Sequence, residues 1–329
     1  LYLLVQGPYM LLVLRFVHGF ATAIFSPVAS AAVADLFQYE RGEKLGWFAS
    51  ANEVGSAFGP LLGGLILAAL VGHGLFKFQV IYLVVGGIGV FTLWLALRLP
   101  IGLAPPKPPP LTVAADPTVG RWKQFTRGMG EVLNNRPILI ASSVESAMFL
   151  GVGALLGFLP LYARNIVGLG DVHLGVLIWM PLVMAMVGKP ISGRISDRIG
   201  RKPVILMGLG LCTGMLPLVP LTTHFMALLA EGALFGLGMA IVTPSTNALV
   251  ADLCKAGNYG AAMGIFGTIW DVGEASGPIL AGALIALYGD LQSASAYLAA
   301  FGIVAVPLVI AGLAFAIVVR EPQTGLQQA

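Results

Sequence analysis

Long apolar stretches alternate with short polar connections along nearly the whole chain. About 20 apolar residues in a helix, at 1.5 Å per residue, are enough to cross the ~30 Å hydrocarbon core of a membrane. Nine stretches reach that length: Tyr9–Leu36, Gly46–Val71, Gln79–Leu99, Ile138–Tyr162, Val172–Ser196, Pro203–Leu221, Phe225–Leu253, Tyr259–Leu287 and Ala294–Val319. The sixth has the least regular pattern, because Pro217 and Pro220 lie near its end. We therefore predict an all-α membrane protein with nine transmembrane helices.

The longest polar connection, residues 100–136, divides the nine stretches into three and six. Its proline-rich run at 105–110 favours extended polyproline geometry over helix. Apolar residues then recur every three to four positions among basic ones, at Val119, Trp122, Phe125, Met129 and Val132. This pattern predicts a short amphipathic helix on the membrane surface, although a basic solvated linker fits it equally well. The expected domains are a bundle remainder with three spans at 1–99, the linker at 100–136 and a six-helix bundle at 137–329.

Lysine and arginine residues fall mostly on one set of alternate connections. Cytoplasmic connections of membrane proteins carry an excess of these residues. If the first span ends in the cytoplasm, the cytoplasmic side holds 14 of the 18 lysines and arginines, and the opposite connections hold only Lys77 and Arg164. Arg15 and Lys189 lie within spans. We therefore predict a multi-pass protein of the cell membrane whose C-terminus is cytoplasmic.

Two pairs of segments are similar to each other within the chain. Gly19–Leu36 aligns without gaps with Gly236–Leu253, with nine identities in 18 positions, and Gly55–Ile66 aligns with Gly273–Leu284, with six in 12. Both pairs lie on consecutive predicted spans, as in transporters that consist of two parallel repeats. The matching spans are the fourth and fifth of the second bundle. The repeat therefore predicts three further spans before Leu1, twelve in all, and an N-terminally truncated sequence.

Composition excludes several other classes of protein. Hydrophobic residues make up 57% of the 329 residues and charged residues only 10%, against about 25% in soluble domains. The net charge of +3 is too small and too dispersed for binding nucleic acid. Two cysteines and four histidines without regular spacing predict neither a metal site nor a cofactor. Because the sequence contains no nucleophile elbow and no phosphate-binding loop, we expect no enzyme, and an ion gradient as the energy source.

A basic motif with two glycines occupies the short connection between the fifth and sixth predicted spans. Gly193 permits close approach of two helices and Gly200 a tight turn, and the charged residues can pair with acids, helix ends or lipid headgroups. The pattern Gly-x-x-x-Asp-Arg-x-Gly-Arg-Lys resembles the cytoplasmic-loop signature of the major facilitator superfamily. Its fixed positions are Gly193, Asp197, Arg198, Gly200, Arg201 and Lys202.

The resemblance implies two pseudo-symmetric six-helix bundles that work by alternating access, usually as a monomer. It also implies that the loop is a gate latch, whose acid is held against a helix of the opposite bundle. The alternative is that the loop residues serve only topology and folding.

Two further motifs resemble those of drug–proton antiporters in this family. Arg15 followed by Gly19 resembles the family's fourth-helix pattern, but His18 stands where these antiporters usually have Gln. Arg15 either faces a substrate or an acid, or snorkels to the membrane surface. The next span resembles the fifth-helix antiporter pattern at Gly55, Gly59, Pro60, Gly63 and Gly64. Ordinary packing through small residues is the alternative for that span.

Acidic residues within the spans are the candidates for ion coupling or substrate binding. A charge in hydrocarbon costs at least about 2.5–3.5 kcal/mol, so a buried one normally faces a cavity or a partner. Glu53 and Glu145 are the first candidates, and Asp271 and Glu231 follow. For Glu53 and Asp271 the alternative is a hydrogen bond to a neighbouring Ser or Asn, and for Glu145 it is a hydrogen bond on a polar face with the serines at 142, 143 and 146.

The repeat relates two of these acids. It places Asp271 at the position equivalent to Glu53, so the two could bind a cation or exchange protons. Asn52 and Trp270, beside them in the sequence, offer a polar contact and a stacking surface.

Together these features predict a secondary active transporter that exports hydrophobic or amphiphilic small molecules in exchange for protons. The alternatives are a symporter or uniporter of sugars, organic acids or other metabolites and, more remotely, a membrane receptor that does not transport. The expected partners are a small-molecule substrate, protons and the lipid bilayer.

Overall fold

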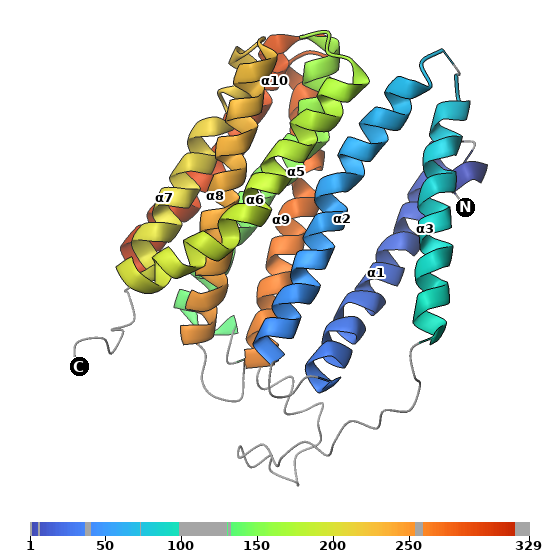
Figure 1. The fold of residues 1–329 in the computed structure, drawn as a ribbon. Coiled ribbons are helices and arrows are strands. Elements are labelled where there is room, and N and C mark those ends of the chain that lie inside the picture. The colour runs from blue at the N-terminus through green and yellow to red at the C-terminus, as the bar shows by residue number, and fades with distance from the viewer. Residues whose placement is uncertain are drawn as a thin grey trace, which may run out of the picture. The chain divides into compact units, whose positions relative to one another are not determined.

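The structure is a computed structural model that describes residues 2–5, 7–36, 41–72, 74–98, 130, 133–253 and 259–319. Over these residues the regular elements are helices and no strand occurs. The long helices (Figure 1) are α1 Pro8–Leu36, α2 Arg41–Ala69, α3 Phe76–Arg98, α5 Arg136–Asn165, α6 Asp171–Ile199, α7 Arg201–Met215, α8 Phe225–Leu253, α9 Tyr259–Tyr288 and α10 Ala294–Val318. The proline-rich run and the predicted amphipathic helix of the linker lie outside the described residues.

Each of the nine predicted spans falls on one of these helices. The sixth stretch is interrupted as its prolines suggest: α7 ends at Met215, a turn follows, and the short 3-10 helix η2 covers Val219–Leu221. Proline lacks a backbone N–H and cannot continue the hydrogen-bond ladder of a helix. The prediction of an all-α fold is confirmed.

Seven helices in the described part of the chain are long and apolar enough to cross a membrane, α7 being extended through η2 to Leu221. The predicted spans on α2 and α9 are not among these seven. α2 is strongly apolar only over Val54–Ala69, and α9 carries Asp271 and Glu274 at its centre. Polar groups within a span lower its hydropathy but are tolerated where they face protein or water. The chain is thus a multi-pass membrane protein.

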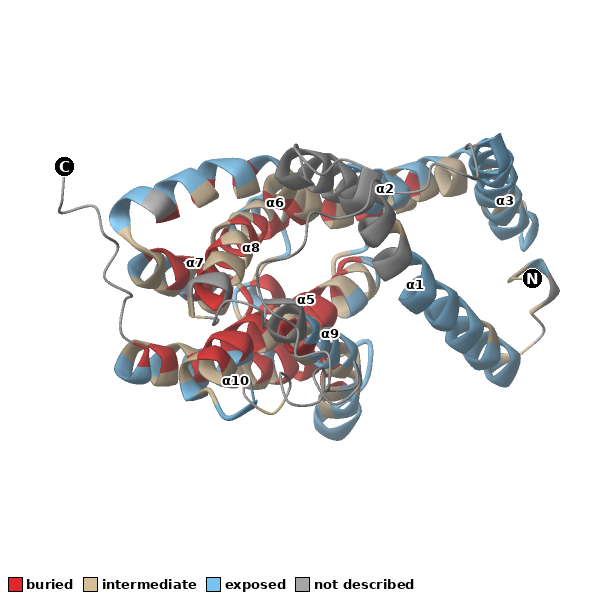
Figure 2. Ribbon diagram, turned by 90° about the horizontal axis from the view of Figure 1, so that it is seen from below, coloured by how far each residue is buried: buried red, intermediate tan, exposed pale blue. Residues whose placement is uncertain are grey.

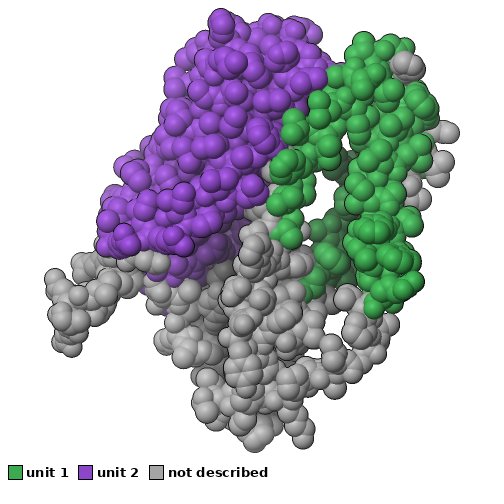
Figure 3. Space-filling view, in the orientation of Figure 1, with its two compact units in different colours: residues 1–111 green, residues 112–329 purple. Residues whose placement is uncertain are grey.

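The chain forms two compact units, residues 1–111 and 112–329 (Figure 3). The division lies within the expected linker. In the first unit α1 packs against α2 and α2 against α3. α3 has no buried residue, and many side chains of α1 are exposed (Figure 2).

The second unit contains the hydrophobic core. α5 packs chiefly against α9, α8 packs against α6 and α7, and α10 covers α5 and α9. Buried residues are concentrated in these helices (Figure 2). The largest fully buried side chains are Tyr162, Tyr297, Phe235, Phe301 and Phe315.

Glycines allow the closest helix pairs of this unit to approach until backbones touch. A Cβ atom on Gly277 of α9 would lie 2.3 Å from the carbonyl oxygen of Leu150 on α5. A Cβ on Gly236 of α8 would lie 2.2 Å from the carbonyl oxygen of Pro181 on α6. Small residues at such interfaces are the usual basis of helix packing in membranes, where close van der Waals contact replaces the hydrophobic effect.

Tyr162, near the end of α5, forms hydrogen bonds with the segment between α7 and α8. Its buried hydroxyl lies 3.1 Å from the carbonyl oxygen of Pro220 and 2.9 Å from that of Thr222, and it can donate to either. We expect Tyr162→Phe to lower the free energy of unfolding by roughly 1–3 kcal/mol, because these carbonyls lose their buried donor. Thermal unfolding of the purified protein in detergent would measure the loss. The half-exposed Tyr288 offers Tyr288→Phe as the control, and an equal effect there would contradict the prediction.

Candidate functional site

Among the acids whose side chains the structure describes, Glu145 is the most completely buried. It lies on α5 and is 1% exposed. Thr246 of α8, 101 residues further along the chain, donates its hydroxyl to Oε2 of Glu145 at 2.6 Å. This bond joins two helices across the core of the second unit.

Helix geometry places the basic residue Lys189 of α6 at a depth in the unit similar to that of Glu145. Successive helices of this unit are antiparallel, so the start of α5 and the ends of α6 and α8 lie together. At 1.5 Å per residue, Glu145, Thr246 and Lys189 all lie about 10–15 Å from those ends. The charge of Lys189 interacts with Glu145, as does the thiol of Cys212 on α7. Glu145 therefore has hydrogen-bonding partners on α8, the side chains of Thr246 and Thr243, and a counter-charge on α6.

Two of the three neighbouring serines that were alternative partners of Glu145 bond elsewhere. Ser142 donates to the carbonyl oxygen of Ile138 and Ser143 to that of Ile140, each at 2.8 Å. Both bonds stay within α5. Thr246 was missed because a threonine within an apolar helix gives no sequence signal of the distant acid that it meets.

The acids of α9 lie in a different environment. Asp271 and Glu274 are exposed on the surface of the second unit. Trp270, which precedes them, packs against Phe149 of α5 with ring centroids 4.4 Å apart. The structure thus provides an aromatic pair beside two carboxylates, but it does not bring Asp271 to Glu145.

Glu231 lies on α8 near the opposite end of the helix from Thr246. Its Oε1 accepts a hydrogen bond from Thr222 at 2.6 Å. Its Oε2 is buried and has no hydrogen-bonding partner among the described residues. Glu231 therefore belongs to the cluster around the α7–α8 break, separate from Glu145.

In the first unit Arg15 and His18 both face Tyr2. The guanidinium of Arg15 lies 6.0 Å from the centre of the Tyr2 ring, and Nδ1 of His18 lies 3.3 Å from its hydroxyl. Gly19, one turn beyond Arg15, is exposed. The side chains of Asn52 and Glu53 lie outside the described residues, although both positions are helical.

The two glycine-proline motifs related by the repeat are packed differently. Pro60 lies within α2, and Gly64 beside it on the helix is buried. Cβ atoms on the other motif glycines would meet nothing within 4 Å, which holds for Gly55, Gly59 and Gly63. The equivalent glycines of α9, Gly273 and Gly277, touch the backbone of α5.

The basic loop motif lies at the turn between α6 and α7. Gly200 has φ +99°, a conformation that favours glycine, and it ends one helix and precedes the next. A Cβ on Gly193 would lie 4.0 Å from Cβ of Pro244, so α6 approaches α8 closely there. Arg198 is exposed, and the side chain of Asp197 lies outside the described residues.

Two basic side chains of the motif hold neighbouring elements. Nη1 of Arg201 donates to Oγ of Ser196 at 3.2 Å, and Nζ of Lys202 donates to the carbonyl oxygen of Ala316 at 2.6 Å. The second bond places a cation at the C-terminal end of α10, where the helix dipole favours positive charge.

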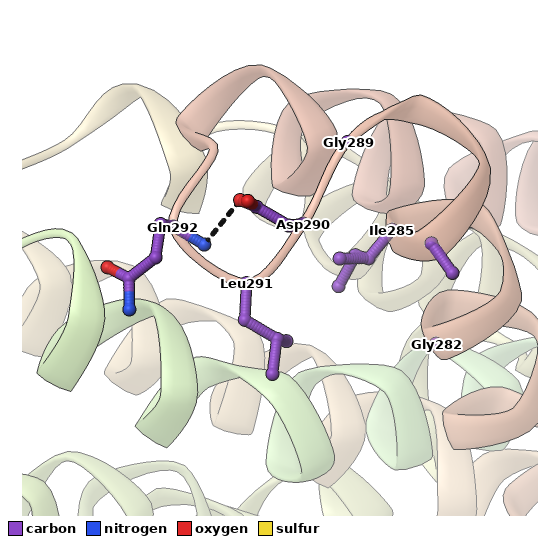
Figure 4. A pocket seen from close by; sticks show the side chains of 7 residues that line it. Gly282, Ile285, Gly289, Asp290, Leu291 and Gln292 are labelled. Carbon is purple, nitrogen blue, oxygen red and sulfur yellow. Dashed lines mark hydrogen bonds between the residues drawn. The ribbon is translucent and has the colours of Figure 1, made fainter.

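A shallow cavity of about 560 Å³ lies at the turn between α9 and α10 (Figure 4). Gly282 and Ile285 line it from α9, and Asp290 lines it from the turn. The carboxylate of Asp290 accepts a hydrogen bond from the backbone N–H of Gln292 at 2.8 Å. None of the predicted site residues lines this cavity.

Among the described residues, no group of three or more His, Cys, Asp or Glu is placed to hold a metal ion.

Two proteins similar to this chain are named for drug resistance. The chain is 30% identical to the class H tetracycline resistance protein of Pasteurella multocida over 166 residues, which are 48% of this chain and 39% of that protein. It is 28% identical to the quinolone resistance protein NorA of Staphylococcus aureus over 151 residues, 45% of this chain and 39% of that protein. The matches thus span about two fifths of the length of these relatives.

The family match covers far more of the chain. The family model described as the Major Facilitator Superfamily matches residues 1–216 and 171–329, so the two overlapping matches include every residue. The all-helical membrane fold, the internal repeat and the basic loop between α6 and α7 agree with this family match. The chain therefore belongs to the Major Facilitator Superfamily of membrane transporters.

Proposed function

We propose that this protein exports hydrophobic or amphiphilic small molecules from the cell in exchange for protons. The observation that carries the proposal is Glu145, a carboxyl group enclosed within a membrane span and bonded to Thr246. A group that binds and releases a proton inside the membrane is the simplest element by which a proton gradient can drive transport. The relatives, which are named for resistance to tetracycline and quinolones, support export as the direction.

The mechanism proposed is alternating access in the cell membrane, with the C-terminus in the cytoplasm. The distribution of lysines and arginines supports this orientation. In this scheme Glu145 is the first coupling acid of the second unit and Asp271 and Glu231 are secondary ones. The Trp270–Phe149 pair offers a surface for an apolar or aromatic substrate.

The basic loop is proposed as a latch at the cytoplasmic end. Arg201 and Lys202 hold it to Ser196 and to the end of α10. Asp197 and Arg198 are then the residues proposed to engage and release another element during the cycle.

Efflux of ethidium, a fluorescent lipophilic cation, tests the proposal. We expect cells that lack other exporters but produce the full-length protein to extrude ethidium, and a protonophore to reduce the rate to that of cells without the protein. In everted vesicles, nigericin with potassium should stop ethidium uptake by collapsing the pH difference. Inward transport into intact cells, or export that survives both treatments, would overturn the proposal and favour a symporter or uniporter of metabolites.

A further inference from the structure

The hydroxyl of Thr246 lies within hydrogen-bonding distance of three oxygen atoms. Oε2 of Glu145 is at 2.6 Å, and the carbonyl oxygens of Val242 and Thr243 are each at 3.0 Å. Thr246 is fully buried. A hydroxyl has one proton to donate and can also accept hydrogen bonds, so Thr246 can donate to only one of these oxygens at a time. The Thr246 hydroxyl can therefore donate either to the Glu145 carboxylate or to one of the two backbone carbonyl oxygens.

We propose that Thr246 is a positioning residue that gives Glu145 a hydrogen-bonding partner in both of its protonation states. When Glu145 is ionised, the Thr246 hydroxyl donates to its carboxylate. When Glu145 gains a proton, its O–H donates to Oγ1 of Thr246, and the threonine proton rotates to the carbonyl oxygen of Val242. The proposal rests on the proposed function of Glu145, because the exchange matters to transport only if this acid gains and loses a proton during the cycle.

The exchange has a physical advantage in a buried site. A buried polar group without a partner carries a desolvation penalty, and a charged one carries a larger penalty. With Thr246 in place, neither the carboxylate nor the carboxyl group lacks a partner. Hydroxyl rotation about a single bond requires no movement of α5 or α8, so the bond can be kept while the proton comes and goes.

Charged and polar groups from several helices surround Glu145. From α6 comes Lys189, from α7 the thiol of Cys212, and α8 supplies neutral hydroxyls. The acids Asp271 and Glu274 of α9 are exposed. The remaining neighbour, α10, contributes Tyr297, which contacts Tyr162 at the far end of α5. The side chain of Thr243 also bonds to Glu145, but Thr246 is the residue whose hydroxyl lies 2.6 Å from the carboxylate and also within reach of two backbone carbonyl oxygens.

The test compares Thr246→Val, which has nearly the same shape but no hydroxyl, with Thr246→Ser, which keeps it. Ser245→Ala is the matched control, because Ser245 is equally buried but donates within α8 to the carbonyl oxygen of Ile241 at 2.8 Å. The first measurement is the infrared carbonyl band of protonated carboxyl groups in the purified full-length protein in lipid, across a pH series. The band that disappears in Glu145→Gln belongs to Glu145. The second measurement is proton-driven ethidium uptake into everted vesicles.

We expect Thr246→Val to move the Glu145 band and to reduce uptake about tenfold or more, since hydrogen bonds to charged groups have effects of at least that size. Thr246→Ser should restore both, and Ser245→Ala should change neither. An unmoved band in Thr246→Val, or a Glu145 band found at no pH, would overturn the proposal. If the band moves as expected but Glu145→Gln still transports with the proton gradient, the positioning role stands and the proposed coupling role of Glu145 fails.

Discussion

Replacing Glu145 with glutamine is expected to abolish proton-driven transport while leaving the protein folded. Glutamine has almost the same shape, and its amide oxygen can still accept the hydrogen bond of Thr246. It cannot ionise, so the proton step is lost. The variant resembles the permanently protonated state, and we therefore expect it to keep exchange of substrate for substrate, which needs no net proton movement.

Two assays in everted vesicles separate these activities. Gradient-driven ethidium uptake should fall to background in Glu145→Gln, whereas exchange of preloaded ethidium for external ethidium should continue. Asp290→Asn provides the control, because this exposed carboxylate lies in the turn between α9 and α10 and is not among the proposed coupling acids. Gradient-driven uptake that persists in Glu145→Gln and disappears in Glu53→Gln would instead place the coupling acid in the first unit.

The sequence was sufficient to locate the helices because membrane spans carry a strong one-dimensional signal. A run of apolar residues must be about as long as the bilayer is thick, whatever the run packs against. The break after Met215 was also foreseeable, because Pro217 and Pro220 act locally. The signal is weaker for α9, since Asp271 and Glu274 interrupt its apolar run, but the run was still long enough to be predicted as a span.

The surroundings of the candidate acids were not foreseeable in the same way. Sequence position suggested the serines near Glu145 as its partners, but side chains on one helix compete for their own backbone carbonyls. Ser142 and Ser143 bond within α5, and the partner comes from α8. Which residues of two distant helices meet depends on helix rotation and crossing angle, and neither is encoded in hydropathy. The family resemblance supplies a fold, but it does not supply these contacts.

The glycines of α9 were also only partly predictable in their role. The sequence indicates a packing face, and the structure identifies the helix that this face meets. A Gly-x-x-x-Gly spacing predicts a smooth helix face for close packing, but not the helix against which that face packs. The structure identifies α5, because Cβ atoms at Gly273 and Gly277 would lie 2.2 and 2.3 Å from the backbone oxygens of Ser146 and Leu150. These contacts fix α9 against the helix that carries Glu145.

Gly277→Ala is therefore expected to destabilise the packing interface between α5 and α9. The added Cβ would also lie 2.8 Å from the backbone nitrogen of Ala154, and backbone atoms of α5 cannot rotate away as a side chain can. Overpacking of this kind costs typically about 1–3 kcal/mol, which exceeds the roughly 1 kcal/mol that alanine gains over glycine in a helix. We expect a lower midpoint of thermal unfolding in detergent and less folded protein in the membrane.

A substitution at a glycine with open space around it distinguishes the effect of packing from the effect of helix propensity. Gly302 of α10 has nothing within 4 Å of a Cβ position, so Gly302→Ala should leave the unfolding midpoint unchanged or raise it. The two substitutions add the same methyl group to helices of the same unit, and only the contact with α5 differs. If both variants unfold at the same temperature as the parent protein, α5 and α9 do not approach as closely as their glycines allow. If Gly277→Ala alone is destabilised, the close backbone contact between α5 and α9 accounts for the difference, because the two variants add the same methyl group.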